Sequence, residues 1–142
     1  MMSLNHLHPM LVHFPIALAV VGFIAEFAAL ILKKEVCLSR AGFYLLLTGT
    51  LAAIAAVLSG VLFTDEMAGS AGEIQETHEL FAWITLGLLV VTSLIRVYLE
   101  VKKSDDSTLK WAAFGLYGLA AIAVSVTGFF GGTLVYEYMM PL

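Results

Sequence analysis

The side chains of this sequence best suited to chemistry are its four histidines. Three of them, His6, His8 and His13, fall within the first 13 residues, and the fourth is His78. A neutral imidazole nitrogen binds haem iron or a bare transition-metal ion, so two or more histidines brought together could hold either kind of cofactor. Whether they can meet depends on the elements that carry them.

Four long apolar runs dominate the chain and position these histidines. They extend over about 9–32, 41–63, 80–98 and 111–136, in a chain of 142 residues that is 61% hydrophobic with a mean hydropathy of +0.96. Each run has roughly the 20 residues that an α-helix needs to cross about 30 Å of hydrocarbon. The sequence therefore predicts an all-α fold in the lipid bilayer. We expect residues 1–142 to form a single membrane domain. Its four-span transmembrane bundle runs up-down-up-down, because the connections are short.

The basic residues indicate which way this bundle faces. All seven Lys and Arg residues flank the first and third connections, and none lies at the opposite end of the spans. Loops rich in positive charge stay in the cytoplasm, so we expect both termini and the 64–77 connection on the non-cytoplasmic side of the membrane. The outer face then combines the histidines with acidic side chains, which are Asp65, Glu66, Glu73, Glu76, Glu79 and Glu137. The net charge of −4 argues against a nucleic-acid partner.

In this topology His13 and His78 begin the first and third spans at similar membrane depth. Ionisable side chains inside a bilayer tend to face the bundle interior and to have partners there. The leading hypothesis is therefore a small b-type haem protein in electron transfer, with His13 and His78 as axial ligands. Glycines at that depth on the second and fourth spans, Gly60, Gly128 and Gly131, could leave room for the flat cofactor, although close helix packing is the commoner reason for small residues there.

Two observations weigh against haem, and two alternatives stay open. The outer face has no Lys or Arg to meet the propionates, and His13 and His78 could differ in depth by a turn. The first alternative is a divalent metal ion bound by His8, His13, His78 and Glu137, although their spacing matches no known metal signature. The second is a cofactor-free accessory subunit of a larger respiratory or transport assembly. The sequence leaves open which of His6, His8 and His13 pairs with His78.

No catalytic constellation is visible in the sequence. It has no serine beside a base, no phosphate-binding glycine loop and no paired carboxylates at fixed helical spacing, so no enzymatic activity is predicted. The acidic outer face could attract a basic partner such as a cytochrome c. The sequence also leaves open whether the chain forms a homo-oligomer.

Two further features concern the helices themselves. Glu26 and Arg96 each lie about 17 residues, or ~25 Å, from the outer start of their spans, which predicts a salt bridge between the first and third spans. Pro15 has two interpretations. It could bend a helix that begins at Pro9, by removing the hydrogen bond to the Leu11 carbonyl, or it could itself open the regular helix.

The N-terminal segment and the end of the fourth span carry a family resemblance. Residues 8–18, with the sequence HPMLVHFPIAL, resemble a bacterial membrane family known as domain of unknown function 2231. Residues 131–136, GGTLVY, are similar to that family's second hallmark. The resemblance implies a four-span fold with a histidine at the third span, and it supplies no established activity. Some relatives are fused to cytochrome c modules, which makes an electron-transfer setting plausible by association alone.

Overall fold

A computed structural model describes residues 7–33 and 35–138 of the chain. Every regular element in these ranges is a helix, and no strand occurs in them. The helices are α1 (Leu7–Leu11), α2 (His13–Ile31), α3 (Val36–Phe63), α4 (Ser70–Lys102) and α5 (Ser107–Tyr136). With α1 and α2 counted as one, four helices are long and apolar enough to cross a membrane. The prediction of an all-α fold with four spans is confirmed.

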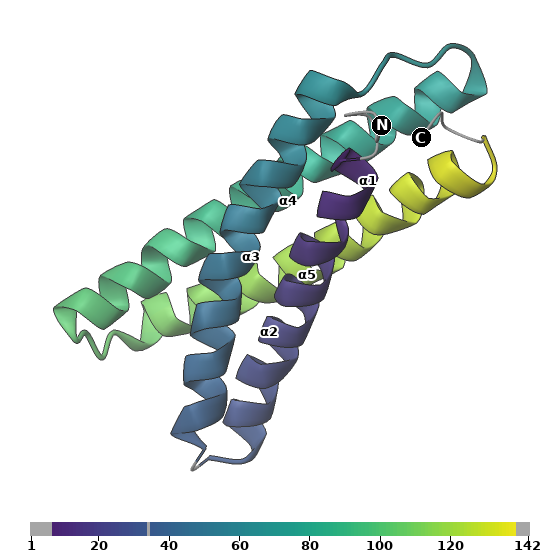
Figure 1. Ribbon diagram of the computed structural model, residues 1–142. Coiled ribbons are helices and arrows are strands. Elements are labelled where there is room, and N and C mark those ends of the chain that lie inside the picture. The colour runs from purple at the N-terminus through teal and green to yellow at the C-terminus, as the bar shows by residue number, and fades with distance from the viewer. Residues whose placement is uncertain (1–6, 34, 139–142) are drawn as a thin grey trace.

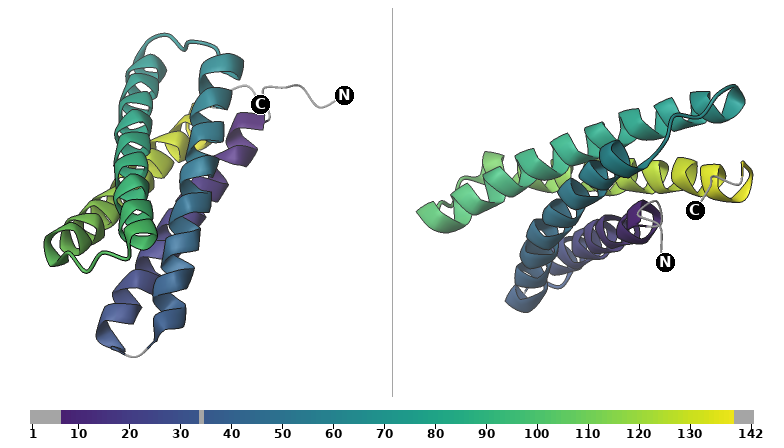
Figure 2. Two further views of the ribbon diagram at one scale, coloured as in Figure 1. Left: turned by 90° about the vertical axis from the view of Figure 1, so that its left-hand side faces the viewer. Right: turned by 45° about the horizontal axis from the view of Figure 1, so that its top comes forward.

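The helices pair into two antiparallel hairpins, α2 with α3 and α4 with α5 (Figure 1). Between the hairpins α2 packs on α5 and α3 packs on α4, so the four long helices share one core. The hairpins diverge toward their own connections, residues 32–35 and 103–106, as Figure 1 and Figure 2 show. Each hairpin is therefore a tightly packed unit, and the two units meet most closely away from those connections.

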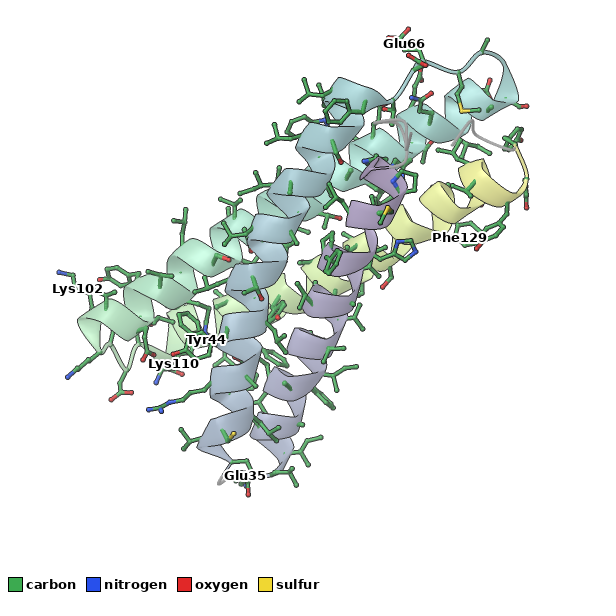
Figure 3. The ribbon with its side chains drawn as sticks, in the orientation of Figure 1. Glu35, Tyr44, Glu66, Lys102, Lys110 and Phe129 are labelled. Carbon is green, nitrogen blue, oxygen red and sulfur yellow. The ribbon has the colours of Figure 1, made fainter. Side chains whose placement is uncertain are left out.

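The two ends of the bundle differ in charge. Lys102 and Lys110 lie beside the connection that joins α4 to α5, whereas Glu66 lies at the opposite end of the molecule (Figure 3). We call the end that holds the connections 32–35 and 103–106 the basic end. The acidic end is the opposite one, with α1, the connection 64–69 and the last turn of α5.

The connection at the acidic end is shorter than the sequence suggested. The expectation that it extends over 64–77 is wrong, because α4 begins at Ser70. Gly69 ends the connection with a φ of 68°, a left-handed conformation that glycine adopts without strain. The Gln75 amide accepts a hydrogen bond from the Met67 N–H at 2.8 Å and so ties the connection to α4. The first turns of α4 are polar, and a helix that extends beyond hydrocarbon needs no apolar run there.

The start of the first span fits neither interpretation of Pro15 alone, because a helical Val12 joins α1 to α2 and the two together form one span from His8 to Ile31. Pro15 is the third residue of α2, and the N–H that it lacks leaves the hydrogen bond to the Leu11 carbonyl unmade. The preceding residues stay helical, and the Val12 N–H donates to the His8 carbonyl at 3.1 Å.

The bundle has a core of small side chains and an apolar outer surface. Tyr117, Leu46 and Leu89 are the largest of the fully buried apolar side chains. Alanines fill much of the remaining core, and small residues let membrane helices approach closely. Large apolar side chains such as Phe14 and Leu94 point outward, which suits surroundings of lipid. A hydrogen bond of 2.8 Å between the hydroxyls of Thr50 and Ser93 joins α3 to α4 inside this core.

Candidate functional site

His8 and His78 come together at the acidic end of the bundle. His8 belongs to α1 and His78 to α4, and their ring centroids lie 6.2 Å apart with an interplanar angle of 85°. Both side chains are half-buried. Among the described residues, His8 is thus the N-terminal histidine that pairs with His78. His6, also a candidate, lies outside the described residues.

Main-chain carbonyls hold both imidazoles by the same nitrogen. His8 Nδ1 donates to the Ala56 carbonyl at 3.1 Å and lies 3.0 Å from the Ser59 hydroxyl. His78 Nδ1 donates to the Thr127 carbonyl at 2.9 Å. A carbonyl oxygen only accepts, so each neutral ring carries its proton on Nδ1 and a lone pair on Nε2. Neither Nε2 atom has a hydrogen-bond partner in the described part of the chain. Metal-binding histidines are commonly oriented in this way.

Glycines lie against the edges of both rings. A Cβ atom at Gly60 would stand 3.0 Å from His8 Cε1, and one at Gly131 would stand 3.1 Å from His78 Cε1. The third predicted glycine, Gly128, instead packs against α2, where its Cβ would lie 2.9 Å from Cδ1 of Ile16. Gly60 and Gly131 therefore decide how close each ring lies to the helix beside it, whereas Gly128 lets α2 and α5 approach.

The other proposed ligands lie apart from this pair. His13 is exposed at the start of α2, and its Nδ1 donates to the Pro9 carbonyl at 2.7 Å. Glu137 is exposed just after α5. Within residues 7–33 and 35–138, no three His, Cys, Asp or Glu side chains gather closely enough to hold a metal ion. The described residues therefore assemble a two-histidine site and not the four-ligand set.

A second polar cluster lies toward the basic end. Arg96 Nη2 and Glu26 Oε1 are 2.6 Å apart, which joins α4 to α2 across the bundle. This is a contact of charges and not an aligned hydrogen bond, because Oε1 accepts none from the described residues. The Tyr117 hydroxyl donates to the Gly42 carbonyl at 3.3 Å and joins α5 to α3. The Arg96 guanidinium also stands 5.8 Å from the centroid of the Phe43 ring.

Comparison with known proteins identifies the family. A family described as "Predicted membrane protein (DUF2231)" matches residues 5–141. The chain belongs to that family. No curated protein and no solved structure matches the chain. Membership of DUF2231 confirms the family that residues 8–18 and 131–136 suggested, and the family description states a membrane location without an activity.

Sequence reasoning missed several groups that hold the rings in this DUF2231 protein. The Ala56 and Thr127 acceptors are main-chain oxygens, which every residue type supplies, so no sequence signal marks them. Ser59 on the second span was also missed, and its hydroxyl donates to the Ala56 carbonyl at 2.7 Å. Tyr117 was missed as well. The glycines that lie against it on neighbouring spans, Gly22 and Gly42, are the signal that could have found it.

Proposed function

We propose that this protein binds haem iron between His8 and His78 and transfers electrons at the outer face of a bacterial inner membrane. The haem iron would be held through the two Nε2 atoms. Haem supplies one-electron chemistry, and the chain supplies the ligands, their orientation and an apolar surrounding.

The separation of the two rings carries this proposal. A metal–nitrogen bond is about 2 Å long and a ring nitrogen lies about 1 Å from its ring centre, so two imidazoles on opposite sides of one metal have centroids roughly 6 Å apart. Two imidazoles on a tetrahedral metal have centroids roughly 5 Å apart. The distance of 6.2 Å between the His8 and His78 centroids is closer to the first value than to the second, and it supports a metal that the two Nε2 atoms would share.

The distribution of charge supports the orientation. Lys and Arg residues of a membrane protein concentrate in its cytoplasmic loops, so the basic end would face the cytoplasm and both termini would lie outside. The histidine pair would then lie near the outer surface, among exposed carboxylates such as Glu66, Glu76 and Glu79. An acidic surface attracts a basic partner, which suits a soluble electron carrier such as a cytochrome c.

A bare transition-metal ion is the second candidate for the same site. It is favoured by the two Nδ1 hydrogen bonds to carbonyls, which leave both Nε2 atoms ready to bind any metal that accepts imidazole. Such an ion would have two nitrogen ligands from the described residues and would need further ligands from water or a partner.

The test is the visible absorption spectrum of the detergent-purified protein, from cells supplied with a haem precursor. We expect a Soret band that sharpens and shifts on reduction by dithionite. The band disappears in His8→Ala and in His78→Ala, and it persists in the matched control His13→Ala. Elemental analysis of untagged protein tests the bare ion in parallel.

Two results contradict haem ligation by this pair. One is a colourless protein despite full haem supply. The other is a band that survives the loss of His78. A colourless and metal-free protein that copurifies with larger membrane proteins points instead to an accessory subunit.

A further inference from the structure

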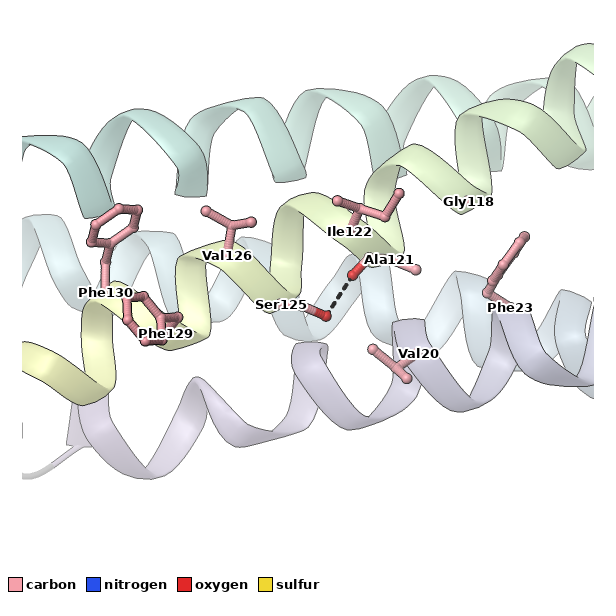
Figure 4. Close-up of a pocket in the computed structure, with 9 residues that line it drawn as sticks. All are labelled: Val20, Phe23, Gly118, Ala121, Ile122, Ser125, Val126, Phe129 and Phe130. Atoms are coloured by element: carbon pink, nitrogen blue, oxygen red, sulfur yellow. Dashed lines mark hydrogen bonds between the residues drawn. The ribbon is translucent and has the colours of Figure 1, made fainter.

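Two serines of the bundle bond back onto their own helices, and only one of them reaches a histidine. Ser125 of α5 lies in an apolar groove between α2 and α5, and its hydroxyl donates to the Ala121 carbonyl at 2.8 Å (Figure 4). Ser59 of α3 donates in the same way to the Ala56 carbonyl at 2.7 Å, but its oxygen also lies 3.0 Å from Nδ1 of His8. Ser59 is only 4% exposed, so water hardly competes for this contact.

The protons of the Ser59 cluster can be placed from its acceptors. The Ala56 carbonyl only accepts, and it lies within hydrogen-bond distance of both the Ser59 hydroxyl and His8 Nδ1. The single hydroxyl proton of Ser59 goes to that carbonyl, so the serine oxygen presents a lone pair to the imidazole. The Nδ1–H of His8 is therefore shared between two acceptors. In the opposite tautomer the bare Nδ1 would face the Ala56 oxygen at 3.1 Å, and that contact would have no proton in it.

His78, the other half of the pair, is held by a carbonyl alone. Its Nδ1 donates to the Thr127 carbonyl at 2.9 Å. The Thr127 hydroxyl bonds elsewhere, since it donates to the Ala123 carbonyl at 2.8 Å and lies 3.3 Å from the Thr85 hydroxyl. An acceptor on the far nitrogen fixes the tautomer of an imidazole ligand and raises its basicity. The two imidazoles are thus unequal, and the difference comes from one side chain.

We propose that Ser59 is a positioning residue, which holds His8 in the Nδ1–H tautomer and makes it the more basic ligand of the pair. The tautomer belongs to the chain without any cofactor. The effect on haem rests on the proposed function, because it requires iron at Nε2. A more basic imidazole stabilises ferric iron over ferrous iron, so Ser59 lowers the reduction potential of a bound haem.

The first test needs no cofactor. Nitrogen NMR of the detergent-purified apoprotein, at a pH at which imidazoles are neutral, distinguishes a protonated ring nitrogen from a bare one. We expect Ser59→Ala to give His8 a measurable fraction of the Nε2–H tautomer and to leave His78 unchanged. Ser59→Thr keeps a hydroxyl and restores the Nδ1–H form.

Two matched controls each remove one hydroxyl. Thr127→Ala deletes the hydroxyl beside His78 but keeps the carbonyl that holds the ring, and Ser125→Ala deletes one that reaches neither histidine. Neither control should alter a tautomer. In the haem-loaded protein we expect Ser59→Ala to weaken haem binding by about 10-fold and to raise the reduction potential. Ser59→Thr should return both values toward those of the wild type, and the two controls should keep them.

Three outcomes would overturn the role of Ser59. The first is an unaltered His8 tautomer in Ser59→Ala. The second is an altered tautomer that Ser59→Thr does not restore, although it unfolds at the wild-type temperature. The third is an equal change in Ser125→Ala, which would indicate a general effect of losing a hydroxyl. A colourless protein whose His8 tautomer responds as described contradicts the haem proposal alone. A haem-loaded protein in which Ser59→Ala changes neither tautomer nor potential contradicts the role of Ser59 alone.

Discussion

The two polar clusters of the bundle differ in how their polar side chains are partnered inside the membrane domain. Toward the basic end, Glu26 and Arg96 meet charge to charge, and the buried carboxylate is neutralised within the protein. At the acidic end, His8 and His78 each use one nitrogen to hold a helix and leave the other without a partner among the described residues. A cluster whose two charges compensate each other stabilises the arrangement of helices. A cluster that fixes the orientation of its rings and leaves their Nε2 acceptors without a partner is suited to binding a ligand.

This comparison predicts that substitutions in the ion pair change stability most. In Arg96→Leu the buried Glu26 carboxylate loses its counter-charge, which destabilises a protein by about 3–5 kcal/mol. We expect a large fall in the thermal unfolding temperature in detergent. The double variant Glu26→Leu/Arg96→Leu regains much of it, because no uncompensated charge is left.

An exposed ion pair serves as the control. Lys110 Nζ lies 2.7 Å from Asp105 Oδ1, much like the buried pair, but both side chains are largely in solvent. Exposed pairs contribute little, so Lys110→Ala should leave the unfolding temperature unchanged. Equal effects of Lys110→Ala and Arg96→Leu, or none in Arg96→Leu, would remove the structural role assigned to the buried pair.

The glycine beneath Tyr117 is expected to give the next largest effect. A Cβ atom at Gly22 would collide with the hydroxyl of Tyr117, whose side chain is fully buried and cannot move aside. Overpacking of this kind costs about 1–3 kcal/mol. Gly87→Ala is the matched control, because the space beside Gly87 is open. A lower unfolding temperature in Gly22→Ala, and not in Gly87→Ala, would support a rigid cluster at this depth. Similar temperatures for both variants would argue against it.

The ion pair and the histidine pair also differ in how far the sequence could predict them. Hydropathy fixed the four spans because each must cover the same thickness of hydrocarbon. Counting residues from the outer start of each span was enough to bring Glu26 and Arg96 to one depth, since both lie deep within regular helices. The family resemblance rested on contiguous motifs, which can be recognised without any knowledge of the fold.

The acidic end could not be predicted as well, because there the helices begin and end. The directions of His8 and His13 depend on the exact register of the first helix, and a shift of one residue turns a helical side chain by about 100°. The polar first turns of α4 carry no apolar signal, so its start at Ser70 was missed. The atoms that hold the rings are largely main-chain oxygens. Residue types do not encode those, and only the packed structure brings them to the histidines.

The smallest stability effect, and the sharpest functional one, is expected at Gly131. A Cβ atom there would lie 3.1 Å from His78 Cε1, so the ring must shift by a few tenths of an ångström. The half-buried ring can yield, and we expect Gly131→Ala to leave the unfolding temperature nearly unchanged. The shift moves Nε2 away from the position in which His8 and His78 share one metal, and disturbed ligand orientation lowers metal affinity by about 10-fold.

Haem titration of the apoprotein, followed by the Soret band, measures the affinity of this variant. Gly132→Ala is the matched control, since the space beside Gly132 is open. Weaker haem binding in Gly131→Ala with unchanged stability would separate a binding role from a packing role at the acidic end. If Gly131→Ala instead lowers stability as Gly22→Ala does, and haem binding is unaffected, the two ends do not differ in kind. The histidine pair is then another means of holding helices together.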